Sequence, residues 1–391
     1  MYFDFDIYRK VLATTWRRKT WPGRNSMLVR LLLVEPLLAL VQNVFLLLDY
    51  LLFPTLWRQE VVAPVFIVGH ARSGTTLMHR LMAADGDRFS YFLYWEMFFP
   101  SLTLKKLIVL LGWLDEKLLG AAVYERLRAW DERTFAPYRH MHDMSLWNPE
   151  EDQFVMNAAF VTQQWQLELP LMHEIDIFHI DRMSPKRRRR WLRFYKECVK
   201  RQLVWHGGHK THLSKNPVMS GWVNGLREAF PDARFVVMVR DPMQCIPSVL
   251  KLVETSWQRK KWSRDECLPS LRELTEISFD SFDLPRAALD SNSNIPHAFV
   301  DYRNLTRSPG ETVANVYAAL GIELSSTFAA QLEKQEEREK KHASHFEYSI
   351  EDYEVDVREI ESRLAEHYAR YDWPRGTERG PGIHDQEEPK A

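Results

Sequence analysis

The sequence predicts an α/β fold of three layers, in which a mostly parallel central sheet is flanked by helices and preceded by a hydrophobic helical segment. One observation is a run of four apolar residues at 65–68, typical of a short buried strand, which passes through a glycine-bounded loop into a helical pattern at 75–82. A second is the succession of a helical pattern at 218–230, a turn and an apolar strand at 234–239. Strands that alternate with helices pair in parallel through right-handed crossovers. Further strands are expected at 89–96, 208–217 and 297–300.

The first 60 residues differ in composition from the rest of the chain. Residues 1–24 are rich in aromatic and basic side chains, and residues 27–56 are strongly apolar and long enough to cross a bilayer. Glu35, Gln42 and Asp49 are spaced by seven, which places them on one narrow face of a helix. This polar stripe favours a helix that lies in the membrane interface, with docking on the domain and a true span as alternatives. The expected parts are a membrane-associated helical segment (1–60), a main domain (61–374) and a disordered polar tail (375–391).

The loop between the first strand and its helix has the form of a phosphate cradle. A strand that ends in a Gly-rich loop before a helix directs unpaired backbone N–H groups, and the positive end of the helix dipole, at one point. Gly69 and Gly74 have the spacing of the nucleoside-triphosphate loop, but Thr75 stands where that loop needs its lysine. The basic group lies at Arg72 instead. The loop therefore favours a ligand whose phosphate needs no metal clamp, and it argues against a kinase or an ATPase.

Two motifs carry a family resemblance. The run Arg72-Ser73-Gly74-Thr75-Thr76-Leu77 resembles the 5′-phosphosulfate loop of sulfotransferases that use 3′-phosphoadenosine 5′-phosphosulfate (PAPS). Residues 234–248 resemble their 3′-phosphate motif, with a buried strand, Arg240 at its end and a serine eight residues later. The likeness is to the bacterial-type sulfotransferase family 3, over residues 64–373. It implies a P-loop-like sulfotransferase fold, PAPS as the sulfuryl donor, no required metal, and donor binding by Arg72, Ser73, Gly74, Thr75, Thr76, Arg240 and Ser248.

Three residues become candidates for the chemistry through the same resemblance. Lys215, in a Lys-Asn-Pro run 25 residues before Arg240, is similar to the lysine of the family's Lys-Ser-Pro and is expected to neutralise charge on the transferring sulfonate. His212 lies in a Lys-Thr-His-Leu segment identical to the one that holds the catalytic histidine of cytosolic sulfotransferases. Its distance of 28 residues from Arg240 makes it the reserve candidate. Glu96, at the end of the strand expected at 89–96, resembles the carboxylate base of carbohydrate sulfotransferases, with a helix-capping or salt-bridged carboxylate as the alternative.

A polar cluster lies between residues 140 and 152. It comprises His140, His142, Asp143, Glu150, Glu151 and Asp152. Its spacing fits no structural zinc pattern, and we expect no metal site. The alternatives are a helix start, with carboxylates near the positive end of the dipole, and an acceptor-binding segment. Glu151 is a further candidate for the base.

The sequence thus predicts a PAPS-dependent sulfotransferase that moves a sulfuryl group in line to a hydroxyl or amine of a small-molecule acceptor. The alternatives are a kinase-like phosphotransferase and an inactive nucleotide-binding membrane protein. A formal net charge of −1 indicates no nucleic-acid surface, and three cysteines without paired spacing favour a reducing, cytoplasmic location. Fourteen tryptophans and an apolar helix expected at 104–119 favour a lipid-like acceptor, with a carbohydrate as the alternative.

Overall fold

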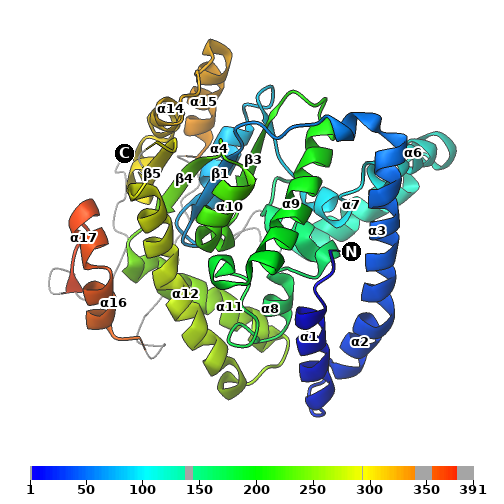
Figure 1. Ribbon diagram of the computed structural model, residues 1–391, viewed down its shortest axis with the longest axis horizontal. Helices are drawn as coiled ribbons and strands as arrows, with labels where there is room; N and C mark the ends of the chain where they lie inside the picture. The colour runs from blue at the N-terminus through cyan, green and yellow to red at the C-terminus, as the bar shows by residue number, and fades with distance from the viewer. Residues whose placement is uncertain (1, 137–143, 293, 340–354, 377–391) are drawn as a thin grey trace.

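The computed structural model describes residues 2–136, 144–292, 294–339 and 355–376 (Figure 1). Its centre is a sheet of five strands in the order β2-β3-β1-β4-β5, and every neighbouring pair is parallel. The strands are β1 (Val65–Gly69), β2 (Phe89–Ser90), β3 (Thr211–Lys215), β4 (Arg234–Val239) and β5 (His297–Asp301). The predicted α/β class with a mostly parallel sheet is confirmed.

Helices cover both faces of the sheet, as the ribbon in Figure 1 shows. One layer contains α4 (Thr75–Ala83), α14 (Pro309–Ala319) and α15 (Ser326–Glu339), and the other contains α9 (Pro185–Trp205), α10 (Val223–Ala229) and α12 (Arg264–Asp290). Phe66 and Val68 of β1 belong to the hydrophobic core on the α9 side, and Val65 and Ile67 belong to the core on the α4 side. Every residue of β1 is buried, as expected of a parallel strand between two helical layers.

The other helices extend this three-layer body. They are α5 (Tyr94–Phe98), α6 (Leu102–Leu119), α7 (Ala122–Phe135), α8 (Gln164–Glu168), α11 (Pro242–Arg259), α13 (Tyr302–Arg307), α16 (Val357–Arg363) and α17 (Ala365–Tyr371). The helix expected at 104–119 is confirmed by α6.

The topology brings three loops together at one edge of the sheet. Strand β1 lies between β3 and β4, with β2 beyond β3 and β5 beyond β4. The carboxyl ends of β1, β3 and β4 therefore lie side by side, which places Gly69, Lys215 and Arg240 in one region. In open α/β sheets ligands bind at such a point, where the order of the strands reverses.

The strand expected at 89–96 is wrong beyond Ser90. Strand β2 has only two residues, and Glu96 lies in the short helix α5. The Leu93 N–H donates to Glu96 Oε2 at 2.9 Å, and the Glu96 N–H donates to the Leu93 carbonyl at 3.0 Å. The carboxylate thus caps the first turn of its own helix. The hydrogen bonds of this cap outweigh the strand propensity of the surrounding aromatic residues.

Two other expected helices form differently. The pattern at 218–230 is divided into a 3-10 helix, η6 (Pro217–Trp222), and α10. The carboxylates before the apolar run near 152 do precede a helix, but it is the 3-10 helix η4 (Asp152–Ala159). Proline at 217 removes one backbone donor at the start of η6, where the tighter turn tolerates its loss.

The N-terminal segment packs on the main body instead of standing apart from it. Helix α1 (Phe5–Arg17) is followed by one continuous helix made of α2 (Arg24–Val29), the π-helical turn η1 (Arg30–Val34) and α3 (Glu35–Leu52). Phe3 and Ile7 belong to the same hydrophobic core as the α9 side of the sheet. The proposed division at residue 60 therefore remains a prediction.

The polar stripe of the long helix faces the protein. Gln42 Nε2 donates to the Phe98 carbonyl at 2.6 Å, and Asp49 is completely buried. The helix thus docks on the main body through this polar face, while most of its apolar side chains are exposed. The helix from Arg24 to Leu52 is nevertheless long and apolar enough to cross a membrane, with a mean hydropathy of 2.2 in its most apolar window.

Candidate active site

The loop from β1 to α4 requires its two glycines. A Cβ on Gly69, at φ +118°, would lie 2.1 Å from the Met238 carbonyl oxygen, and one on Gly74, at φ +88°, would lie 2.6 Å from the Tyr302 ring. Ser73 Oγ donates to the Met238 carbonyl at 3.2 Å, so this side chain ties the loop to β4. Helix α4 begins at Thr75 without a side-chain cap, which leaves its first backbone N–H groups directed at the loop. The geometry is that of an anion cradle.

The two motifs of the predicted donor site touch each other. Arg72 Nε donates to Ser248 Oγ at 3.1 Å, although 176 residues separate them in the chain. An N–H of the Arg240 guanidinium donates to the Arg72 carbonyl at 3.3 Å. The same guanidinium lies over the Tyr302 ring, 4.3 Å from its centre, in a cation–π contact. Two arginines, a serine hydroxyl and the N-terminus of α4 therefore form one cationic region that can bind phosphate groups.

Lys215 joins this region from the end of β3. Its Nζ lies 3.0 Å from Glu150 Oε1, 3.3 Å from Glu151 Oε1 and 3.5 Å from Thr76 Oγ1. The side chain is fully buried, and burial alone would lower its pKa. The two carboxylates outweigh burial and raise the pKa of Lys215, so the amine stays charged beside the first turn of α4.

His212 faces the other side of the sheet. It lies three positions before Lys215 in β3, and side chains an odd number of positions apart in a strand point to opposite faces. Its Nε2 is 3.2 Å from Asp152 Oδ2 and 3.2 Å from the Tyr195 hydroxyl, which itself donates to Asp152. The imidazole is completely buried in this network, and burial raises the pKa of Tyr195 well above its ordinary value. The structure thus brings Lys215, but not His212, to Thr76.

Glu96 lies in a second buried polar cluster, between α5, α6 and α9. Its side chain is 1% exposed, and Oε2 accepts from Gln202 Nε2 at 2.7 Å in addition to capping α5. Lys105 Nζ lies 3.9 Å from Oε1, and burial lowers the pKa of this lysine to about 8. These contacts match the capping and salt-bridged alternative considered for Glu96.

The sequence did not predict two contacts of the site, those of Glu150 with Lys215 and of Tyr302 with Arg240. Glu150 is 3% exposed and contacts Lys215, and the adjacent carboxylates of the Glu150-Glu151-Asp152 run were the available signal. Tyr302 stacks on Arg240 and approaches Gly74, which only the fold reveals, because 228 residues separate it from that glycine.

Only part of the polar cluster at 140–152 lies within the described residues. His140, His142 and Asp143 lie outside the described residues. Within the ranges that the structure describes, no three His, Cys, Asp or Glu side chains are grouped so as to hold a metal ion. The cysteines at 198, 245 and 267 are buried and free.

Comparisons with known proteins identify the family of the chain. The model of a sulfotransferase family matches residues 64–326. The chain is 26% identical over 334 residues to omega-hydroxy-beta-dihydromenaquinone-9 sulfotransferase Stf3 of Mycobacterium bovis and, equally, to the protein of the same name in Mycobacterium tuberculosis. Each alignment covers 80% of this chain and 76% of the relative.

Two solved structures share the fold. Sulfotransferase STF9 from Mycobacterium avium matches with a TM-score of 0.71 and 18% identity, over 96% of this chain and 98% of that one. Sulfotransferase STF1 from M. tuberculosis matches with a TM-score of 0.65 and 19% identity, over 93% and 94% of the two chains.

Proposed function

Because this chain belongs to the sulfotransferase family, we propose that it transfers the sulfuryl group of PAPS to a hydroxyl of a lipid-like acceptor. The observation that carries the proposal is the contact between the two anion-binding motifs, in which Arg72 donates to Ser248 and Arg240 donates to Arg72. One nucleotide with a phosphate at each end of its ribose matches two adjacent cationic groups on one sheet edge.

The donor site is built from the cradle and the guanidinium pair. Backbone N–H groups of residues 72–76 and the Arg72 guanidinium hold the 5′-phosphosulfate, while Arg240 and Ser248 hold the 3′-phosphate. The donor supplies an activated sulfuryl group, and its 5′-phosphate oxygen is the leaving atom. Arg72 and the N-terminus of α4 stabilise the charge that develops on this oxygen.

Lys215 and Glu151 carry the transfer itself. Lys215, next to Thr76 and α4, neutralises charge on the sulfonate oxygens as the bond from sulfur to the leaving oxygen breaks. A bond forms at the same time between sulfur and the acceptor oxygen, whose proton passes to a carboxylate. We assign this carboxylate to Glu151, because its side chain is 20% exposed and 3.3 Å from Lys215. Glu96 and His212 are the competing candidates, and their burial in separate networks favours Glu151 over both.

The acceptor class rests on the named activity of the relatives and on the apolar surface of the chain. The two mycobacterial relatives are named for a menaquinone derivative with an omega-hydroxyl group. A long lipid alcohol of this kind suits a protein whose α3 and α6 expose many leucines. We accordingly propose a cytoplasmic protein that associates with the membrane through residues 27–56.

Product formation tests the proposed reaction directly. The protein is incubated with radiolabelled PAPS and either a polyprenyl quinone with a terminal hydroxyl or a lipid extract of the host, and the sulfated product is identified by mass spectrometry. We expect label in a lipid product with the wild type and none with Arg72→Ala. Label transfer only to water, or to no acceptor in any lipid fraction, would contradict the proposal.

A thermal-shift comparison distinguishes the proposed sulfotransferase from the kinase-like alternative. Adenosine 3′,5′-bisphosphate is expected to raise the melting temperature, and Mg-ATP is expected to leave it unchanged, because threonine replaces the phosphate-binding lysine at 75. Stabilisation by Mg-ATP alone would favour a phosphotransferase.

A further inference from the structure

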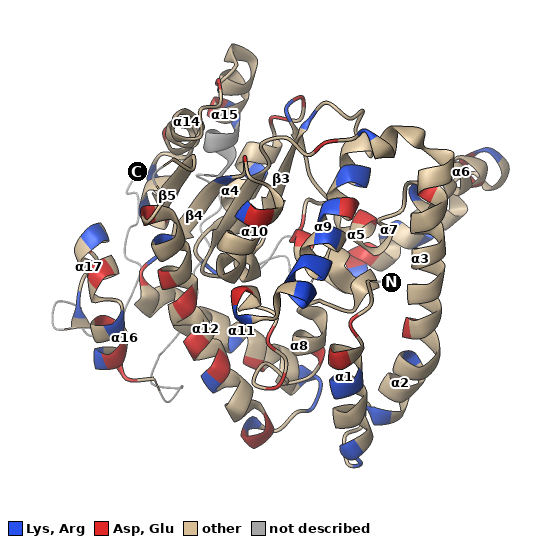
Figure 2. Ribbon diagram, in the orientation of Figure 1, with Lys and Arg blue, Asp and Glu red and all other residues tan. Residues whose placement is uncertain are grey.

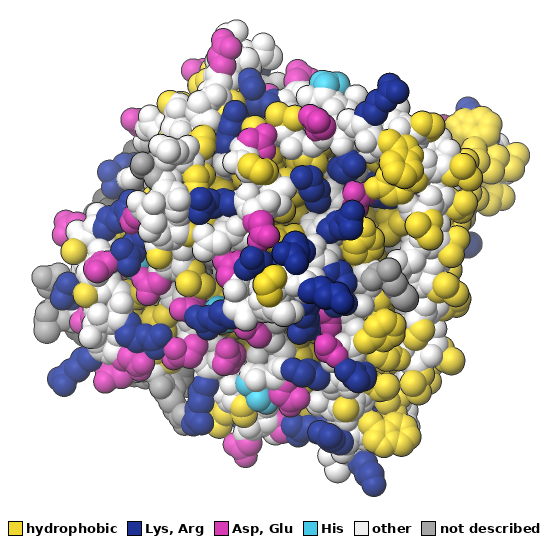
Figure 3. Space-filling view, in the orientation of Figure 1, with side chains coloured by type: hydrophobic (Ala, Val, Ile, Leu, Met, Phe, Trp, Pro, Cys, Tyr) yellow, Lys and Arg dark blue, Asp and Glu magenta, His cyan; other side chains and the backbone are white. Residues whose placement is uncertain are grey.

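The exposed apolar side chains are concentrated on two parts of the chain. In the described ranges 29 large hydrophobic side chains are exposed; twelve lie on residues 24–52 and eleven on residues 102–135. Figure 3 shows them gathered along one side of the molecule, where Figure 1 places α3 and α6. Soluble monomers seldom expose apolar side chains in such a continuous group.

These two parts form one surface. Helix α3 packs on α6, and α6 packs on α7. Leu40 and Leu47, 58% and 73% exposed, lie on the same face of α3, and Leu111 and Leu118, 54% and 74% exposed, have the same spacing on α6. We call the exposed side chains of α3, α6 and α7 the apolar surface. Its members include Leu40, Leu47, Leu111, Trp113, Leu118 and Trp130.

Each of the three helices turns one carboxylate inward, while most other charged side chains of α6 and α7 are exposed. Figure 2 shows that α3 is almost entirely tan, with few charged positions. Asp49, one of the two charged residues of α3, is completely buried. Asp115 of α6 is 7% exposed and accepts from the Val123 and Tyr124 N–H groups at 3.0 and 2.9 Å. Asp131 of α7 is 4% exposed and accepts from the Leu146 N–H at 2.7 Å. The exposed face of α3 is therefore almost wholly apolar, which is the reverse of a helix that meets water and indicates a surface that meets hydrocarbon.

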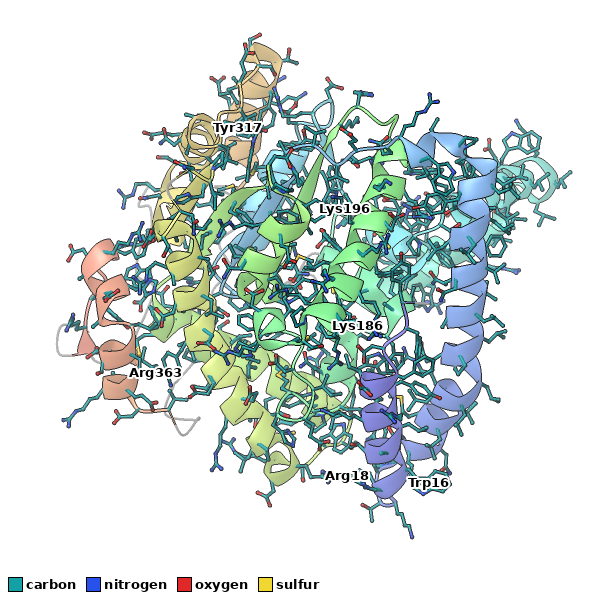
Figure 4. The ribbon with its side chains drawn as sticks, in the orientation of Figure 1. Trp16, Arg18, Lys186, Lys196, Tyr317 and Arg363 are labelled. Atoms are coloured by element: carbon teal, nitrogen blue, oxygen red, sulfur yellow. The ribbon has the colours of Figure 1, made fainter. Side chains whose placement is uncertain are left out.

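The border of the apolar surface is aromatic and basic. Trp16 is 59% exposed at the end of α1, beside Arg18 in Figure 4, and the Arg24 guanidinium lies 5.2 Å from its ring centre. Trp113 and Trp130 are exposed on α6 and α7. Arg17 and Lys19 are exposed at the same end of α1. Tryptophans and basic residues around an apolar face complement the interface and the anionic headgroups of a lipid leaflet.

We propose that the apolar surface of α3, α6 and α7 inserts in the plane of one leaflet of a lipid bilayer, with the basic border against anionic headgroups. A span by α3 is disfavoured, because it would break the hydrogen bonds that Asp49 accepts from Arg201, Ser101 and Thr103. The proposal deepens the membrane association given above by adding α6 and α7 and by fixing the orientation. It concerns lipid binding alone, so its failure would leave the proposed sulfuryl transfer untouched.

Vesicle flotation tests the surface element by element. The purified full chain is mixed with vesicles of phosphatidylcholine and phosphatidylglycerol and separated on a density gradient. Leu40→Glu with Leu47→Glu alters α3, and Leu111→Glu with Leu118→Glu alters α6. Each pair is expected to lower the partition coefficient at least about tenfold, because two exposed leucines that insert into the leaflet are replaced by charges. Val62→Glu with Leu252→Glu, two exposed apolar positions outside the apolar surface, is the matched control and is expected to float like the wild type.

Three results would overturn the proposal. The first is that the wild type does not float with the vesicles. The second is that the α3 variant loses vesicle binding while the α6 variant keeps it. The third is a stable dimer in detergent-free solution that both glutamate pairs convert to a monomer, which would assign the surface to a second copy. Circular dichroism melting of each variant shows that a loss of flotation is not a loss of folding.

Discussion

At the scale of single residues, the site depends on a buried ammonium held between two carboxylates. Lys215 is fully buried and keeps its charge because Glu150 and Glu151 raise its pKa. A lysine in this setting is fixed in position before any ligand binds. Preorganised charge of this kind stabilises a transition state without reorganisation at the moment of reaction.

Removal of this charge is expected to slow the chemical step. Lys215→Met should lower kcat by about 10²–10³-fold, since one electrostatic contact to the developing charge is lost. The measurement is single-turnover transfer from radiolabelled PAPS, with binding of adenosine 3′,5′-bisphosphate as the check on folding. Lys215→Arg should recover part of the rate. Lys210→Met, just before the start of β3, is the matched control, and a kcat of Lys215→Met within about twofold of this control would remove Lys215 from the mechanism.

The identity of the base follows from a second comparison. Glu151→Gln is expected to lower kcat by about 10²–10⁴-fold, because the amide cannot accept the proton of the acceptor. Glu96→Gln should retain most of the turnover, because Glu96 caps α5 and accepts from Gln202 inside a buried cluster. The same comparison includes His212→Asn. If Glu96→Gln or His212→Asn loses turnover while Glu151→Gln keeps it, the assignment moves to that residue.

At the scale of elements, one carboxylate fixes the long N-terminal helix. Asp49 accepts from Arg201 Nε at 2.9 Å, and Arg201 also donates to the Leu46 carbonyl at 2.8 Å. Since Arg201 is 2% exposed, loss of its partner would leave a buried cation unpaired. This pair positions α3 on α9 and therefore sets which face of α3 is exposed.

Asp49→Ala is expected to lower the free energy of unfolding by about 3–5 kcal/mol, the usual cost of breaking a buried ion pair from one side. Urea denaturation measures the change. Glu116→Ala, on the exposed side of α6, is the control and should alter stability by less than about 0.5 kcal/mol. A similar stability for the two variants would mean that α3 is held by its apolar contacts alone.

His179, which precedes η5 (Ile180–Arg182), connects this segment to α12 and makes the stability of the fold depend on pH. His179 hydrogen-bonds Asp176 at 3.0 Å and Asp280 at 2.7 Å. Burial alone would lower the pKa of His179, but the two carboxylates outweigh it and raise the pKa from 6.5 to about 9. A group whose pKa is higher in the folded state stabilises the fold fully below the unfolded pKa, and the stabilisation is lost as pH rises through the folded pKa.

Stability should therefore fall between about pH 6.5 and about pH 9, and His179→Gln should remove this part of the dependence. Unfolding free energies from urea titrations across that window provide the measurement. Equal slopes for the wild type and His179→Gln would show that the histidine is not charged in the folded protein.

At the scale of the whole molecule, the parts of the fold and site that could be predicted are those set by local sequence. Gly69 and Gly74 occupy positions that only glycine tolerates, so their spacing marked the loop, and the apolar runs marked β1 and β4. The parallel sheet followed from the alternation of strands and helices.

The rest depends on partners far apart in the chain. Asp49 meets Arg201 across 152 residues and Lys215 meets Glu150 across 65, so neither the orientation of α3 nor the carboxylates beside the lysine could be read locally. Glu96 was misplaced for the opposite reason, because a hydrogen bond to Leu93, three residues away, converted a strand-like run into a helix. The roles proposed for the site residues remain predictions.

The central claim is that Arg72, Arg240 and Ser248 bind one nucleotide through two phosphates. Isothermal titration of adenosine 3′,5′-bisphosphate and of adenosine 5′-monophosphate tests it most directly, in the wild type, Arg240→Ala and Ser248→Ala. We predict that the wild type prefers the bisphosphate and that Arg240→Ala removes about tenfold or more of that preference, since a hydrogen bond to a charged group is lost. If Arg240→Ala weakened both nucleotides equally, or neither of them, the two-phosphate account would be contradicted.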